Sequence, residues 1–355
     1  MVISLVLVFL LSMVSSFFDE RIGERQKIFL YFLIGSSLIL IAGLREVGST
    51  PDTYEYEEMF YGKNTFIEET TEPTFLFISS VLKNFSLGVN ALFLTYAFIS
   101  IVVHLPILWK LSRLPLVTLT IYISYYFMMQ EMVQMRAGVA AGFLLWAIYN
   151  YVEKKKAMAF GCILLAISFH FSAIAGLLLF VLKDRLPQWQ KTILYLLIPI
   201  GLIAYFTNLD LSYLVPDELG GDKLAIYRKF KESGIEDDYA GWSLNINLLL
   251  WMNIILYLAC IYYSELLTKH CKYVPIAIKF QAIGFCFLFF AHGISAVLGN
   301  RMNDLFSIVN IILWTASIYA FCPKIYGIAL SNFISTFRFV SSITVYALAL
   351  LYFKP

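Results

Sequence analysis

The chain has 355 residues, of which 60% are hydrophobic and 14% are charged, and its formal net charge is +2. Soluble domains carry roughly 25% charged residues, and so few polar side chains cannot cover this much apolar surface. The composition therefore predicts a polytopic protein embedded in membrane lipids, and the small net charge indicates no nucleic-acid partner. The five cysteines form no CxxC or Cys/His cluster, which argues against a disulfide framework or a structural zinc site.

Apolar runs follow one another along the chain, and a membrane span needs about 20 largely apolar residues, with roughly 17 tolerated. The N-terminal run lacks a basic region and a cleavage site, so we expect a retained span rather than a signal peptide. The run at 157–182 is interrupted by Ser168–Ser172, which predicts a hairpin of two short helices. Phe75–Leu82 is expected to form an interfacial or re-entrant helix. Cutting the sequence at its charges gives spans near 2–18, 28–44, 86–109, 114–130, 137–152, 157–182, 192–209, 242–264, 280–299, 305–322 and 339–353.

These runs predict an all-α fold, a single transmembrane domain over residues 1–355 with about 11–12 spans, some of them short or broken. Basic residues collect in cytoplasmic loops. With the N-terminus outside, the inner loops hold 16 basic residues, Arg338 among them, and 6 acidic ones, a net charge of +10. The outer side holds 10 basic and 18 acidic residues, a net charge of −8. Two long loops, at 44–83 and 210–241, then face outward, and any chemistry is expected there.

The first outer loop carries an arginine and an aspartate close to the membrane boundary. Thr50 is expected to cap a helix that begins at Pro51, which places Asp52 in the first turn. Arg45 lies at the end of the second span. A guanidinium grips phosphate bidentately, and a carboxylate can accept a proton from a hydroxyl. The pair would therefore suit a lipid-linked phosphate, although a capped surface helix with an interfacial arginine explains the same residues.

Polar residues also interrupt the apolar pattern between the fourth and fifth runs. Gln130 and Gln134 are four residues apart and share one face of an α-helix. Arg136 follows them and precedes the small residues 137–142, which permit close approach of helices. A charge beside a span usually turns toward a cavity. An ordinary outer loop with a snorkelling arginine is the alternative.

Three more polar residues are candidates for the outer face. His170 lies inside the interrupted apolar run, where it is either a hydrogen-bonded core residue or, if the helix breaks there, a proton acceptor or phosphate contact. Arg301 and Asp304 lie between two later runs. If Arg45, Arg136 and Arg301 converge, they would form an anion site such as a diphosphate cradle. The sequence contains no GxSxG, HExxH, Walker or DxD motif, which argues against a metalloprotease, an ATPase or a nucleotide-sugar glycosyltransferase.

Four segments, in this order, resemble the EpsG/O-antigen polymerase (Wzy) group of bacterial polysaccharide enzymes: GLR followed by DTYEYEEMF, QEMVQMRAGVAAGFLLW, AISFHFSAIAGLLLF and NRMNDLF. The resemblance spans roughly residues 30–320. It departs from the family before Tyr54, where the family usually has Gly-Thr-Asp and this chain has the six residues Gly48–Thr53. The extra residues affect the match of Asp52 to the family pattern but not that of Arg45.

The resemblance implies a GT-C-like, metal-independent transferase of the bacterial inner membrane that needs no cofactor. Such enzymes join oligosaccharide repeat units carried on undecaprenyl diphosphate into O-antigen or capsule at the periplasmic face, and a chain-length regulator is a candidate partner. Asp52 or His170 would be the base. The expected substrate-binding residues are Arg45, Tyr54, Gln130, Gln134, Arg136, Arg301 and Asp304. The alternatives are another lipid-phosphate-dependent glycosyltransferase or ligase, and a non-enzymatic flippase of lipid-linked sugars.

Overall fold

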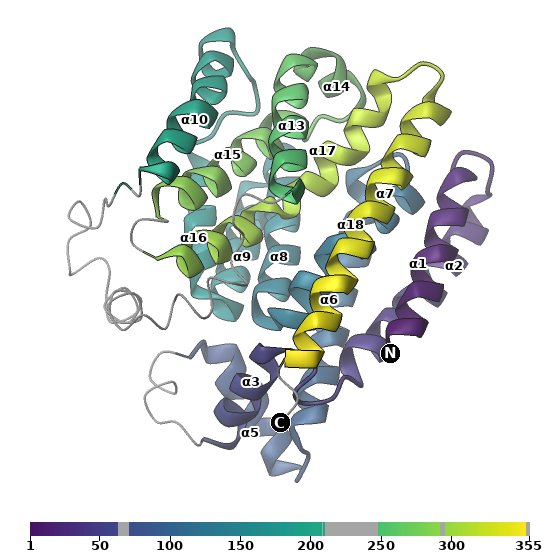
Figure 1. The fold of residues 1–355 in the computed structure, drawn as a ribbon, viewed down its shortest axis with the longest axis vertical. Helices are drawn as coiled ribbons and strands as arrows, with labels where there is room; N and C mark the ends of the chain where they lie inside the picture. The colour runs from purple at the N-terminus through teal and green to yellow at the C-terminus, as the bar shows by residue number, and fades with distance from the viewer. Residues whose placement is uncertain (63–70, 208, 210–247, 292–294, 353–355) are drawn as a thin grey trace. The chain divides into compact units, whose positions relative to one another are not determined.

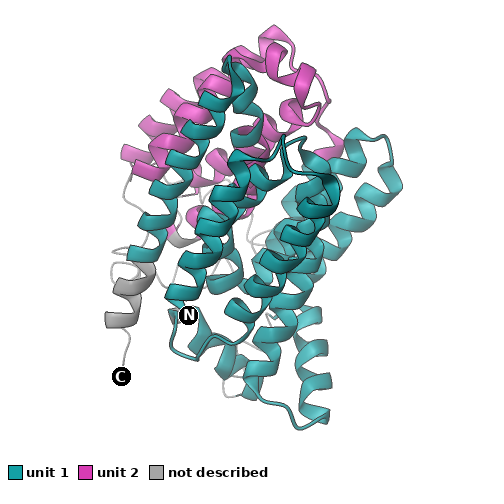
Figure 2. Cartoon of the chain, turned by 90° about the vertical axis from the view of Figure 1, so that its right-hand side faces the viewer, with its two compact units in different colours: residues 1–178, 314–355 teal, residues 179–313 magenta. Residues whose placement is uncertain are grey.

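The computed structural model describes residues 1–62, 71–207, 209, 248–291 and 295–352, and all regular structure in these residues is helical (Figure 1). The expected all-α fold is therefore confirmed. The outer loop predicted at 210–241 lies outside the described residues. Contacts divide the chain into two compact units, residues 1–178 with 314–355, and residues 179–313 (Figure 2). Each unit is considered by itself below.

Unit 1 contains the N-terminal helices and the C-terminal helix. The expected helix start is confirmed, because Thr50 is the N-cap of α3 and Pro51 its first residue. The short apolar stretch in the first outer loop is also helical, within α5. The helices of this unit are α1 (Val2–Phe17), α2 (Glu24–Gly43), α3 (Pro51–Tyr61), α5 (Pro73–Asn84), α6 (Val89–Leu111), α7 (Pro115–Ile121), the π-helix η1 (Tyr122–Val133), α8 (Met135–Val152), α9 (Lys156–Phe169) and α18 (Lys324–Tyr352).

Unit 2 is built from shorter helices, several of them bent or broken. Its α10 contains an internal proline, Pro199, and α13 meets α14 at an angle of 86°. Ser295 caps α16 by accepting a hydrogen bond from the Leu298 backbone N–H. The helices of this unit are α10 (Gln188–Phe206), α13 (Leu248–Tyr262), α14 (Ser264–His270), α15 (Val274–Phe290) and α16 (Ala296–Phe306).

The outward-facing side chains match a lipid environment. On α18 the buried face carries Ser331, Asn332 and Ser335, whereas Phe333 is 72% exposed. This is the reverse of a soluble amphipathic helix, because polar groups pair inside the bundle and apolar groups face the solvent. Asn332 donates a hydrogen bond to Ser16 of α1. By length and composition, α2, α6 and α10 can cross a membrane among the described residues, and the bent pair α13–α14 makes a fourth candidate span.

Shorter apolar helices, such as α1 and α15, accompany these candidates among the described residues. The roughly 11–12 spans expected from the sequence came from cutting the chain at charged residues. Two of these charges lie inside helices. Lys279 belongs to α15, where its Nζ donates to the backbone carbonyls of Lys183 and Arg185 at 2.6 and 2.7 Å. Arg338, expected in an inner loop, lies midway along α18. Without Lys279 and Arg338 the predicted inner side has 14 basic and 6 acidic residues and keeps a net charge of +8, so the charge asymmetry survives this correction. A buried charge with helix on both sides does not mark a loop.

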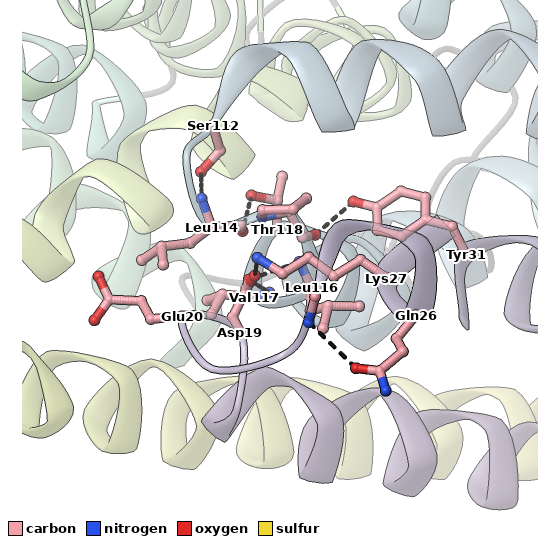
Figure 3. Close-up of polar contacts among 12 residues, drawn as sticks. Asp19, Glu20, Gln26, Lys27, Tyr31, Ser112, Leu114, Leu116, Val117 and Thr118 are labelled. Atoms are coloured by element: carbon pink, nitrogen blue, oxygen red, sulfur yellow. Dashed lines mark hydrogen bonds and ion pairs between the residues drawn. The ribbon is translucent and has the colours of Figure 1, made fainter. Parts of the chain in front are cut away.

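One buried aspartate links the connection between α1 and α2 to α7. Asp19, in the connection between α1 and α2, accepts hydrogen bonds from the backbone N–H groups of Leu116 and Val117 at 2.8 and 3.1 Å. Lys27 pairs with the same carboxylate at 2.8 Å (Figure 3). The N-terminus of α7, whose N–H groups have no partner within the helix, is thus capped from another part of the chain.

Candidate functional site

A buried glutamate that the sequence analysis did not single out joins two of the predicted site residues. Glu72 is the N-cap residue of α5 and is 1% exposed. Its Oε2 pairs with Nη1 of Arg136, the second residue of α8. Its Oε1 lies 3.3 Å from Nδ1 of His170. Residues 64 and 98 positions apart in the sequence therefore meet on one carboxylate within unit 1.

The helix break at His170 creates part of this geometry. α9 ends at Phe169, His170 is extended, and the 3-10 helix η2 (Phe171–Phe180) follows. The break leaves a backbone N–H without a helical partner, and the N–H of Phe171 donates to Oε1 of Glu72 at 3.4 Å. Thr74 of α5 donates its hydroxyl to the Ser168 carbonyl at 2.6 Å. The first turn of α5 is thus fastened to the break.

The interrupted run reverses direction at this break, as predicted. A Cβ added at Gly176 in η2 would lie 3.9 Å from the side chain of Ile163 in α9. These two residues stand on opposite sides of His170, so the chain folds back on itself there. The hairpin places His170 at its tip.

Aromatic rings enclose the Arg136 guanidinium. Its Cζ lies 5.4 Å from the ring centroid of Tyr56 and 5.7 Å from that of Phe75. Tyr96 and Phe169 continue the aromatic wall, with centroids 6.1 Å apart in an edge-to-face arrangement. Such cation–π contacts help to hold the guanidinium in place, in addition to its ion pair. The Arg136 and His170 side chains remain 15% and 21% exposed, whereas the Glu72 side chain is 2% exposed, so within this cluster the imidazole and the guanidinium are more exposed than the carboxylate.

The segment before Arg136 is a π-helix, which changes the expected arrangement of the two glutamines. In η1 the Gln134 N–H donates to the Met129 carbonyl, five residues back. The α-helical face shared by Gln130 and Gln134 therefore does not form. Gln130 is buried at 2% exposure, and Gln134 stands at the junction of η1 and α8. π-helical segments are rare and frequently mark functional sites.

The predicted residues of the first outer loop lie at different depths. Arg45 is 1% exposed; its Nη1 donates to the Ala42 carbonyl and its Nη2 to the Met135 sulfur at 3.3 Å. The structure thus places Arg45 beside the residue that precedes Arg136. Asp52 is partly buried in the first turn of α3, and Tyr54 is 37% exposed. How these groups act on a substrate stays a prediction.

Arg301 and Asp304 belong to α16 of unit 2, where Asp304 is 9% exposed. Arg45, Arg136 and His170 belong to unit 1. The two units are described separately, so the convergence of the three arginines stays a prediction.

A family comparison identifies the chain. The model of the EpsG family matches residues 28–354, nearly the whole length. The chain belongs to the EpsG family. EpsG is a Wzy-like polysaccharide polymerase family, which confirms the resemblance inferred from the sequence motifs and indicates a polymerase of the glycosyltransferase type. Comparisons with curated proteins and with solved structures found no match.

Glu72 was missed because its signal in the sequence is local and weak. A polar residue followed by Pro73 at the start of an apolar stretch indicates a helix start, and that much was readable. Nothing in the sequence around residue 72 shows that its carboxylate is buried, or that Arg136 and His170 reach it.

Proposed function

We propose that this EpsG-family protein polymerises oligosaccharide repeat units carried on undecaprenyl diphosphate into O-antigen or capsular polysaccharide. The reaction is a metal-independent glycosyl transfer at the periplasmic face of the inner membrane. Family membership supports the polymerase class. The observation that carries the site assignment is the pairing of Glu72 with both Arg136 and His170.

The pairing suits general-base catalysis by His170. Oε1 of Glu72 lies 3.3 Å from Nδ1 of His170, and a carboxylate at this side of the ring favours the tautomer that carries its proton on Nδ1 and leaves Nε2 as the proton acceptor. Nε2 would remove the proton of the acceptor sugar hydroxyl. The resulting oxygen attacks the anomeric carbon of the growing chain, and the bond from that carbon to the diphosphate oxygen breaks as the diphosphate leaves with the electron pair.

Glu72 would position the other side chains of this site, and Arg136 would bind the diphosphate. Because its two carboxylate oxygens face Arg136 and His170, Glu72 is a positioning residue rather than the base. Arg136 remains partly exposed and can donate to the departing diphosphate, which stabilises the charge that develops there. Asp52 remains the alternative base, since it lies in the first turn of α3, a partly buried position in the same outer loop.

The test is polymerisation by purified protein in nanodiscs, with lipid-linked repeat units as the sole substrate. Wild-type protein should produce a ladder of chain lengths. His170→Gln should slow the transfer by about 10²–10⁴-fold, the usual contribution of a general base. His270→Gln is the matched control, because that histidine lies between Lys269 and Lys272 in a segment predicted to face the cytoplasm, and it should keep the wild-type ladder. An unchanged ladder in His170→Gln would assign the base elsewhere, with Asp52→Asn as the next variant.

Two other functions are distinguished by the same system. A ligase would leave the repeat units unjoined until a different acceptor is added. A flippase would move lipid-linked units across the bilayer without forming a ladder, and deletion of its gene would abolish surface glycan. Deletion of a polymerase gene leaves single repeat units on the surface.

A further inference from the structure

Arg338 is a buried cation that has no counter-ion among the residues that the structure describes. It lies on the inner face of α18 and is 2% exposed. Its Nη1 is buried without a hydrogen-bond partner, and within the part of the chain that the structure describes its guanidinium makes no ion pair. Its neighbours are two rings of η1: the Cζ atom lies 4.7 Å from the centroid of Tyr125 and 5.1 Å from that of Tyr126.

Several other buried or half-buried cations among the described residues have polar partners, and Arg45 donates to the Ala42 carbonyl. Arg136 has Glu72, Lys27 has Asp19, and Lys279 has two backbone carbonyls. A charged side chain buried within a membrane helix is costly. Cation–π contacts stabilise such a charge less than a counter-ion or a full set of hydrogen bonds would. The tyrosine rings therefore offset only part of the cost of burying Arg338.

A second polar group without a partner lies beside Arg338. Tyr126 is 1% exposed, and its hydroxyl makes no hydrogen bond with the described part of the chain. Buried polar atoms are nearly always satisfied, so each exception calls for an explanation. A guanidinium and a phenol are both hydrogen-bond donors. Two unsatisfied donors at one place match a ligand that supplies acceptor oxygens and negative charge.

The residues around Arg338 also favour a binding site. Tyr125 and Tyr126 are consecutive residues of the π-helix, and their rings stand at 90° with centroids 5.3 Å apart. Ser335 lies on the same face of α18 as Arg338, one turn away, and is 3% exposed. The outer faces of this helix are apolar, with Phe333 72% and Val340 57% exposed. An anion that reaches this helix from the bilayer would therefore arrive on a lipid.

We propose that Arg338 and Tyr126 bind the phosphate groups of a lipid-linked diphosphate, an assignment that rests on the proposed function for the identity of the lipid. A guanidinium matches phosphate in a bidentate geometry. A repeat-unit polymerase handles two lipid diphosphates, one on the growing chain and one on the incoming unit. The charge of Arg136 is already compensated by Glu72, whereas that of Arg338 is free to bind one of the two.

Binding, measured separately from catalysis, tests this proposal. Wild-type protein and variants are placed in nanodiscs of zwitterionic phosphatidylcholine, and their affinities for a glycan-free polyprenyl diphosphate and for inorganic pyrophosphate are compared. Arg338→Gln should weaken binding of the polyprenyl diphosphate at least about tenfold, the loss of one charge-assisted contact. Tyr126→Phe should weaken it less, because the ring remains. Arg113→Gln removes an exposed arginine of the same unit and should leave the affinity unchanged.

Equal affinities of wild-type and Arg338→Gln protein, both folded by size-exclusion chromatography, would make Arg338 a structural residue and overturn the proposal. If Arg338→Gln does not fold, Arg338→Lys and Tyr126→Phe decide, and unchanged affinity in both overturns it. Arg338-dependent binding of pyrophosphate alone would contradict the lipid assignment. The ladder assay separates the two proposals: a wild-type ladder with Arg338-independent binding refutes only this site, whereas Arg338-dependent binding without any ladder refutes only the polymerase function.

Discussion

Gly138, in the first turn of α8, shows how closely single residues are packed around the π-helix. A Cβ at this position would lie 2.9 Å from Oε2 of Glu131 and 3.0 Å from the Gln130 carbonyl oxygen. Glu131 is itself held by a hydrogen bond from the Tyr122 hydroxyl at 2.8 Å and has His104 within 3.6 Å. The small residues expected to permit close approach therefore do so at the turn that precedes Arg136.

Gly138→Ala should destabilise the protein, because the added methyl group forces the buried Glu131 and the Gln130 backbone to move. Overpacking of this kind typically costs about 1–3 kcal/mol. Gly161→Ala is the matched control, since no atom lies within 4 Å of a Cβ there, and a helical Gly→Ala change gains about 0.5–1 kcal/mol. Thermal unfolding in detergent would show the midpoint falling for the first variant and rising slightly for the second. Equal midpoints would contradict the packing of this turn.

At the scale of elements, the connection between α1 and α2 is joined to α7 through one carboxylate. Burial has the largest effect on the Asp19 carboxyl and raises its pKa, while Lys27 and the N–H groups of Val117 and Leu116 lower it. Asp19 therefore stabilises the fold mainly through Oδ2, which accepts hydrogen bonds from two backbone N–H groups, rather than through its charge.

Asp19→Ala should cost about 1–3 kcal/mol of stability, because it leaves two buried N–H groups of α7 and the Lys27 ammonium without an acceptor. Asp19→Asn should cost less, since its amide oxygen can still accept. Glu20→Ala is the control: the Glu20–Lys324 pair is about half exposed at both ends, and exposed pairs contribute about 0–1 kcal/mol. Chemical or thermal unfolding of the three variants should give this order. A larger loss for Glu20→Ala than for Asp19→Ala would contradict it.

For the whole molecule, sidedness is the property that the proposed function most needs. The charge asymmetry predicts that the α5–α6 connection faces the periplasm and the α6–α7 connection faces the cytoplasm. Lys83 and Arg113 are exposed residues at these two places. Because α6 is one of the helices able to cross the membrane, its two ends must emerge on opposite sides.

Cysteine labelling measures this orientation. In a cysteine-free background, Lys83→Cys should react with a membrane-impermeant maleimide in intact spheroplasts, and Arg113→Cys should react only after lysis. Removing the natural cysteines first is necessary because Cys286 and Cys322 are exposed. The reverse labelling pattern would place the Glu72 site on the cytoplasmic side and refute the periplasmic reaction.

Local and compositional properties were readable from the sequence alone. The apolar fraction determined a helical membrane protein, and the motifs around Arg136 and His170 determined the family. Thr50–Pro51 marked a helix start and residues 168–172 a break, because capping and interruption depend on neighbours along the chain. Cutting the sequence at charged residues gave wrong span boundaries at Lys279 and Arg338, because both lie inside helices that bury them.

Only the tertiary structure decided which of these residues meet. No sequence pattern places Glu72 between Arg136 and His170, or Tyr126 against Arg338. Burial and pairing arise when segments far apart in the chain pack together, whereas periodicity and capping report only a few neighbouring positions. For that reason the sequence could supply candidate site residues, and packing decided which of them share the Glu72 carboxylate and which arginine has no ion pair among the described residues.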